Sequence, residues 1–140
     1  MHTTIRTVLF AAALGVGFNA LAGQDMTVYQ DPDCGCCHGW AQYMRAEGFE
    51  IQEIPSRDMA AVKARLGVPP NLVSCHTAVV ASSGQVIEGH VPAAAVRKLL
   101  ADPRIRGVAA PGMPLNSPGM GKMDGRLTTL DFNGRHFSQD

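Results

Sequence analysis

Three of the four cysteines of this chain stand in one short motif, Cys-Gly-Cys-Cys at positions 34–37. The fourth, Cys75, lies much farther along the chain and is followed directly by His76. Thiols at this density pair as disulfides, exchange with other disulfides or bind a soft metal. A fold that brings Cys75 to the motif would gather four sulfur atoms, so the place of the motif among the strands and helices matters most.

The sequence around the motif alternates between strand and helix patterns. The expected strands are residues 26–30, 49–54, 77–81 and 86–90, and the expected helices begin after the motif, at Ser56 or Asp58, and at Pro92. This β-α-β-α-β-β-α order resembles that of a thioredoxin-like α/β fold. Cys34-x-x-Cys37 stands where that fold has its Cys-x-x-Cys motif. The loop before the third strand faces the motif in that fold, so we expect Cys75 beside the other cysteines.

The C-terminal part of the chain has a different composition. Residues 107–126 are rich in Gly, Pro, Met and Ser and show no period, which predicts a loop or flexible arm. Residues 127–137 contain Asn133-Gly134 between two short apolar runs, which predicts a β-hairpin. We expect residues 23–140 to form one thioredoxin-like domain that includes both segments.

The first residues have the pattern of a signal peptide. Arg6 precedes an uncharged apolar run at 8–18, and Ala20-Leu21-Ala22 matches a small-x-small cleavage site, which predicts a signal peptide at 1–22. The run is short for a transmembrane span, although an uncleaved anchor is the alternative. We expect a mature chain in a bacterial periplasm with no membrane span. The 12 basic and 12 acidic residues balance, so no charge pattern indicates nucleic acid.

The spacing of the cysteines helps to separate the chemistries open to them. Near a helix N-terminus, free N–H groups and the helix dipole stabilise thiolates, which bind soft metals and attack disulfides. A dithiol oxidoreductase needs only Cys34 and Cys37, and Cys36 between them would compete for the mixed disulfide. A structural zinc site usually has two pairs of ligands, whereas copper(I) prefers sulfur ligands and tolerates bridging. Export also leaves open two structural disulfides, such as Cys34–Cys37 with Cys36–Cys75.

Histidine and methionine side chains could complete such a site. The candidates are His76, His90, Met113, Met120 and Met123. His76 follows Cys75 directly, and His90 ends the strand expected to pair with residues 77–81. The three methionines lie in the Gly/Pro-rich segment, where there is little apolar surface to bury, and their thioethers are soft ligands. Ordinary surface packing is the alternative for the methionines, and His38 could be either a ligand or exposed.

Five short motifs in one order resemble a known family. VYQDPDCGCC, GVPP, SCHTA, EGHVP and PGMP stand in this order between residues 27 and 119. They are similar to motifs of the CopG-type periplasmic copper-resistance proteins. The resemblance implies a thioredoxin-like fold and a multinuclear, thiolate-bridged copper cluster. Carried over by position, its sulfur ligands are Cys34, Cys36, Cys37 and Cys75. His76, His90 and Met113 stand in the same motifs, while Met120 and Met123 lie past the match.

We therefore expect a periplasmic copper-binding protein for copper resistance and homeostasis. It would hold copper(I), and then store the copper, cycle it between Cu(I) and Cu(II), or pass it to a periplasmic copper chaperone or efflux system. The pattern is more typical of a metal-binding protein than of an enzyme, and a copper oxidoreductase activity stays open. Two other functions also stay open: a thiol–disulfide oxidoreductase using Cys34 and Cys37, and a structural zinc-binding domain.

Overall fold

The order of strands and helices up to residue 100 agrees with the sequence prediction. The computed structural model describes residues 23–140, so the predicted signal peptide at 1–22 lies outside the described residues. The elements are β1 Asp25–Gln30, α1 Gly35–Ala46, β2 Glu50–Pro55, α2 Met59–Leu66, a 3₁₀ turn at Pro70–Leu72, β3 Thr77–Val80, β4 Val86–Glu88, α3 Ala93–Leu100, β5 Gly107–Ala109, β6 Thr128–Asp131 and β7 His136–Gln139. No helix within the described range is long and apolar enough to cross a membrane.

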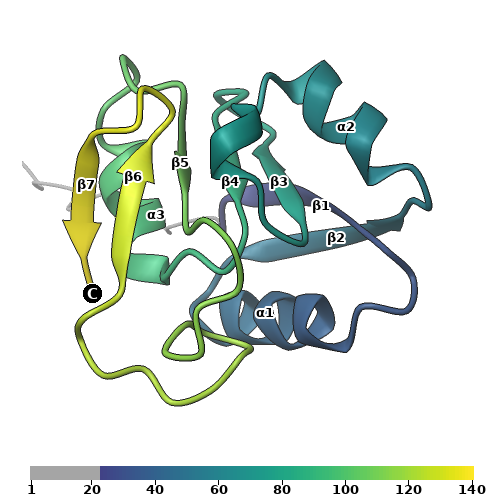
Figure 1. The fold of residues 1–140 in the computed structure, drawn as a ribbon, viewed down its shortest axis with the longest axis horizontal. Coiled ribbons are helices and arrows are strands. Elements are labelled where there is room, and N and C mark those ends of the chain that lie inside the picture. The colour runs from purple at the N-terminus through teal and green to yellow at the C-terminus, as the bar shows by residue number, and fades with distance from the viewer. Residues whose placement is uncertain (1–22) are drawn as a thin grey trace, which may run out of the picture.

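The strands form one mixed sheet in the order β2-β1-β3-β4-β5-β6-β7 (Figure 1). β1 is parallel to β2 and antiparallel to β3, and β4 is parallel to β5. The protein is therefore an α/β structure with a seven-stranded mixed sheet and three α-helices. β1 lies between β2 and β3. The loop that follows its C-terminal end leads to the cysteine motif and α1.

The two faces of the sheet are covered by different helices. α1 and α3 share one face, since the Tyr43 hydroxyl of α1 accepts a hydrogen bond from the backbone N–H of Ala93 in α3, at 3.1 Å. Val28 of β1 points to this side and is fully buried in the main apolar core. α2 lies over the opposite face, where the guanidinium of Arg65 sits 5.3 Å from the centre of the Tyr29 ring. Figure 1 shows α1 and α2 on opposite sides of β1 and β2.

The helix ends follow from a few local residues. Of the two expected caps of α2, Asp58 is the one that caps, because its carboxylate accepts a hydrogen bond from the N–H of Ala61 at 3.0 Å. α2 ends at Gly67, which has a φ of +71° and so adopts the left-handed conformation that glycine allows. Cys34 is the N-cap of α1, and its side chain makes no hydrogen bond to the first N–H groups of this helix.

The C-terminal segment is more ordered than its composition indicates. The first three residues of the expected loop form β5, which is fully buried between β4 and β6. A strand of only three residues is too short to show a period. The rest of the segment, residues 110–126, runs through turns on the α1 side of the sheet (Figure 1). β6 and β7 pair around Asn133-Gly134, and β7 extends two residues beyond the expected hairpin.

Candidate metal centre

The cysteine motif forms the first turn of α1. Cys34 is the N-cap, and Cys36 and Cys37 belong to the first helical turn. This turn brings the Sγ atoms of Cys34 and Cys36 to 3.4 Å from each other. Cys34 and Cys37 are joined by a disulfide across a Cα–Cα distance of 5.4 Å, while Cys36 and Cys75 are free. Three sulfur atoms therefore lie at the positive end of a helix, where thiolates are favoured after reduction of the disulfide.

Cys75 lies beside the motif, as the topology predicts. It stands in the loop that precedes β3, next in the sheet to β1. The sulfur atoms of Cys34, Cys36, Cys37 and Cys75 all lie within 4.8 Å of one another. A second group of potential ligands, Cys75, His76 and His90, has its ligand atoms within the same distance. Because Cys75 belongs to both groups, one thiolate at this position can contact ions in either.

His90 presents a free nitrogen to Cys75. Its Nδ1 lies 2.7 Å from the backbone carbonyl oxygen of Pro118, and a carbonyl only accepts, so Nδ1 carries the proton. The lone pair of Nε2 is then directed toward the Cys75 sulfur, 2.9 Å away. Burial lowers the pKa of His90, which keeps the ring neutral near pH 7. A neutral imidazole whose other nitrogen is held by a carbonyl is the usual form of a histidine metal ligand.

His76 is buried with one nitrogen unsatisfied. Its ring lies 4.5 Å from that of Trp40 and 4.8 Å from that of His90, measured between centroids. Burial lowers the pKa of His76 well below its usual value, and the neighbouring His90 and Lys63 lower it further. The side chain is fully buried, and its Nε2 has no hydrogen-bond partner. Its Nδ1 lies 3.6 Å from the Cys75 sulfur, so Nδ1 is the nitrogen placed to share a metal ion with Cys75.

The environment of Cys75 favours its protonated form while no metal is present. Burial raises the pKa of the Cys75 thiol to about 11, and the nearby Cys36 adds to this shift. A soft metal ion displaces such a proton because it binds the thiolate. The donor set of four sulfurs and two neutral imidazoles fits a soft metal, since it contains no carboxylate.

The Gly/Pro/Met-rich segment reaches the site through its backbone. Besides the carbonyl of Pro118, it places Gly119 so close to α1 that an added Cβ would lie 2.6 Å from the N of Trp40 and 2.9 Å from the O of Cys36. Met113 is 52% exposed, and Met120 and Met123 are half-buried. Metal ligation by these three methionines stays a prediction.

Some features of the site were not expected from the sequence. The Pro118 carbonyl and the Trp40 ring both contact histidines of the site, and no sequence signal distinguishes a ligand-orienting carbonyl from any other. His38, which could have been a ligand or exposed, is exposed. Its Nδ1 lies 2.5 Å from the carboxylate of Glu53. His38 therefore turns to β2 and does not belong to either group of potential ligands.

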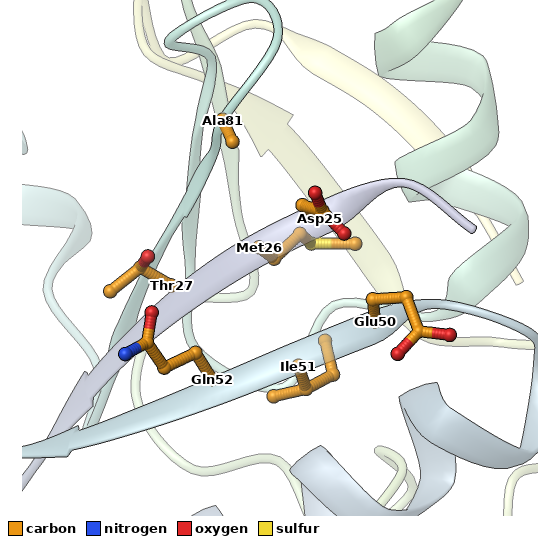
Figure 2. A pocket seen from close by; sticks show the side chains of 7 residues that line it. All are labelled: Asp25, Met26, Thr27, Glu50, Ile51, Gln52 and Ala81. Atoms are coloured by element: carbon orange, nitrogen blue, oxygen red, sulfur yellow. The ribbon is translucent and has the colours of Figure 1, made fainter. Parts of the chain in front are cut away.

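A surface hollow of about 370 Å³ lies at the other end of β1. Figure 2 shows its lining, which comes from the first halves of β1 and β2 and from Ala81. Asp25 and Glu50 contribute its carboxylates, and no cysteine or histidine takes part. β1 runs from this hollow toward the cysteine motif, so the two features are separated by the length of the strand.

The fold and the site define an α/β protein with a cluster of cysteines and histidines able to bind a metal ion. A family model described as "Protein of unknown function, DUF411" matches residues 72–120. Two solved structures of the copper resistance protein CopG, described as Form 1 and Form 2, are each 39% identical to the chain. They cover 84% of this chain and 98% of their own, with TM-scores of 0.73 and 0.74. No curated protein sequence is significantly similar. The chain belongs to the family of the copper resistance protein CopG.

Proposed function

We propose that the protein binds copper(I) at the cysteine and histidine cluster and serves copper resistance. The observation that carries this proposal is the convergence of four cysteine sulfurs within 4.8 Å. Copper(I) is the common soft ion that prefers thiolate sulfur and accepts low coordination numbers. Membership in the CopG family supports copper over other soft metals.

The shared position of Cys75 supports a cluster with more than one ion. The all-sulfur group and the group of Cys75, His76 and His90 together offer six ligand atoms. A structural zinc ion needs four ligands in a closed tetrahedral site, which would leave part of this set unused. A thiolate at Cys75 can bridge two copper ions, one held mainly by the cysteines of α1 and another held with the histidines.

The cellular role follows from the expected export of the chain. We propose that the mature protein lies in the periplasm, where it holds copper(I) and stores it or passes it to a copper chaperone or efflux system. We also propose that the scaffold is thioredoxin-like, which is supported by the order of elements through α3 and by the Cys75 loop facing the start of α1. A bound copper ion would supply one-electron chemistry to the site.

A second candidate function is thiol–disulfide exchange. It is favoured by the disulfide between Cys34 and Cys37 at the N-terminal end of α1, since a helix N-terminus stabilises the leaving thiolate. This function needs neither Cys36 nor the histidines. The two candidates therefore make opposite predictions for a Cys36→Ser variant.

The test is a copper(I) titration without oxygen on reduced protein, with copper per chain measured by native mass spectrometry. The wild-type chain should bind more than one ion, and Cys36→Ser should lose a large part of this loading. His136→Ala is the control, because His136 is exposed on β7, outside both ligand groups. Unchanged loading in Cys36→Ser would contradict the cluster. Disulfide exchange with insulin by a copper-free Cys36→Ser chain would favour the second candidate.

A further inference from the structure

A buried ion pair lies beneath the loop that carries Cys75. Glu88 of β4 is fully buried, and its Oε1 lies 2.6 Å from the ammonium of Lys63 in α2. The Lys63 side chain is 12% exposed. Both residues belong to the α2 face of the sheet, opposite to α1. Transferring charges from water into a protein interior is costly unless further hydrogen bonds satisfy them. The hydrogen bonds that this pair makes therefore indicate what the pair holds in place.

The remaining side-chain hydrogen bonds of Glu88 go to the two ends of the Cys75 loop. Oε1 accepts a hydrogen bond from the backbone N–H of Ser74, and Oε2 accepts one from the hydroxyl of Thr77, each at 2.6 Å. Lys63 also donates to the Thr77 hydroxyl at 3.0 Å. Ser74 and Thr77 flank Cys75 and His76 in the sequence. One carboxylate thus fixes the residues on both sides of two potential ligands.

Glu88 also connects this loop to the strand end that carries His90. The two residues are separated only by Gly89, whose N–H donates to the carbonyl of His76 at 2.9 Å. An added Cβ at Gly89 would lie 2.4 Å from the Ser74 hydroxyl oxygen. The chain that carries Cys75 and the chain that carries His90 are therefore joined by Glu88 and by close backbone contact.

We propose that Glu88, held by Lys63, is a positioning residue that keeps the Cys75 thiolate at the junction of the two ligand groups. This inference rests on the proposed copper site. A carboxylate that accepts hydrogen bonds from a backbone N–H and a hydroxyl fixes both the distance and the orientation of these two groups. Two apolar side chains of the same volume in place of Lys63 and Glu88 would not fix the orientation. Outer-shell groups that orient metal ligands typically change metal affinity tenfold to hundredfold when they are removed.

The test compares the double variant Lys63→Met/Glu88→Gln with the wild-type chain. Both charges are removed together because a single change would leave the other charge buried and unpaired. Copper(I) affinity is measured without oxygen by competition with bathocuproine disulfonate, and hydrogen exchange is measured on the peptide covering residues 72–77 of the metal-free chain. We expect affinity to fall by about tenfold or more, and amide protection in this peptide to fall as well.

Two further variants separate positioning from general stability. Asp131→Asn is the matched control, because Asp131 is a buried carboxylate paired with Arg135 in the β6–β7 turn. It should lower stability and leave copper affinity unchanged. Lys63→Arg keeps the ion pair and should keep most of the wild-type copper affinity, in contrast to the double variant.

A double variant that folds, binds copper(I) like the wild type and keeps its amide protection would overturn the inference. If the double variant does not fold, Thr77→Val is the deciding variant, because it removes the hydroxyl contacts of Thr77 and keeps the bond between Glu88 and Ser74. Weaker copper binding in Thr77→Val than in Asp131→Asn supports the inference, and equal binding overturns it. Failure of the wild-type chain to bind copper would refute the proposed function, and the exchange measurement would then still decide whether Glu88 fixes the loop.

Discussion

A Gly119→Ala substitution tests whether the Gly/Pro/Met-rich segment is part of the site. Gly119 has a φ of +85°, which costs a residue with a side chain about 1–2 kcal/mol. The added methyl would also lie 2.6 Å from the backbone N of Trp40 and 2.9 Å from the O of Cys36. Backbone atoms of a helix cannot move aside, and overpacking of this kind costs about 1–3 kcal/mol. The total loss of stability should be about 2–5 kcal/mol.

Gly125→Ala provides the matched control. Gly125 lies in the same segment with a φ of +73°, and an added Cβ there meets no atom within 4 Å. Its substitution should cost only the backbone term of about 1–2 kcal/mol. Urea unfolding followed by circular dichroism measures both losses. The midpoint for Gly119→Ala should fall by about 1 M more than that for Gly125→Ala, given typical slopes for small proteins.

The same pair of variants should differ in copper binding. Displacement of Gly119 also moves the carbonyl of Pro118, which lies 2.7 Å from the Nδ1 of His90. Loss of such an orienting contact weakens metal binding by about tenfold to hundredfold, whereas Gly125→Ala should bind copper(I) like the wild type. Equal stability losses and equal copper affinities in the two variants would refute the packing of this segment against α1.

Three further predictions concern single side chains. Trp40 is the only tryptophan and lies beside a histidine of the site, so copper binding should quench its fluorescence; an unchanged spectrum on loading would place the metal elsewhere. In the metal-free chain with the Cys34–Cys37 disulfide intact, iodoacetamide should modify Cys75 slowly at pH 8, because burial raises the pKa of its thiol to about 11; mass spectrometry showing fast modification would contradict this. Burial alone would raise the pKa of Glu53, but hydrogen bonds from three neighbouring side chains outweigh it and hold this pKa below the usual value. The stability that the ionised Glu53 contributes is thus present above the unfolded pKa of about 4.3 and is lost as the pH falls through the folded pKa. In urea unfolding series from about pH 5 to pH 2, Glu53→Gln should therefore lose less stability on acidification than the wild type.

The parts of the fold that the sequence predicted are those with local signals. The order of elements through α3 was expected from residue periods and from helix-start residues such as Asp58 and Pro92, and the structure has this order. The approach of Cys75 to the motif at 34–37 followed from topology, because a loop before the third strand faces the start of the first helix. These predictions needed no knowledge of side-chain packing.

Other features could not be predicted because they lack a local signature. β5 has three residues, which is too few to show alternation. The carbonyl of Pro118 is chemically the same as any other carbonyl, and only its place in the fold gives it a histidine to orient. Lys63 and Glu88 look like ordinary surface charges in the sequence, since the burial that makes their pairing informative arises only when α2 and β4 meet.

The wide separation of the site residues along the chain has a consequence for biosynthesis. The first cysteine of the site is residue 34, and the carbonyl that orients His90 belongs to residue 118. A chain that is still being made therefore has the motif at 34–37 without Cys75 and the histidines beside it until most of its length is available. Metal capture becomes coupled to the last stage of folding, when contacts distant in sequence close. On the proposed copper function, the newly made polypeptide would bind copper(I) weakly during synthesis and would gain its full affinity only when the fold is complete.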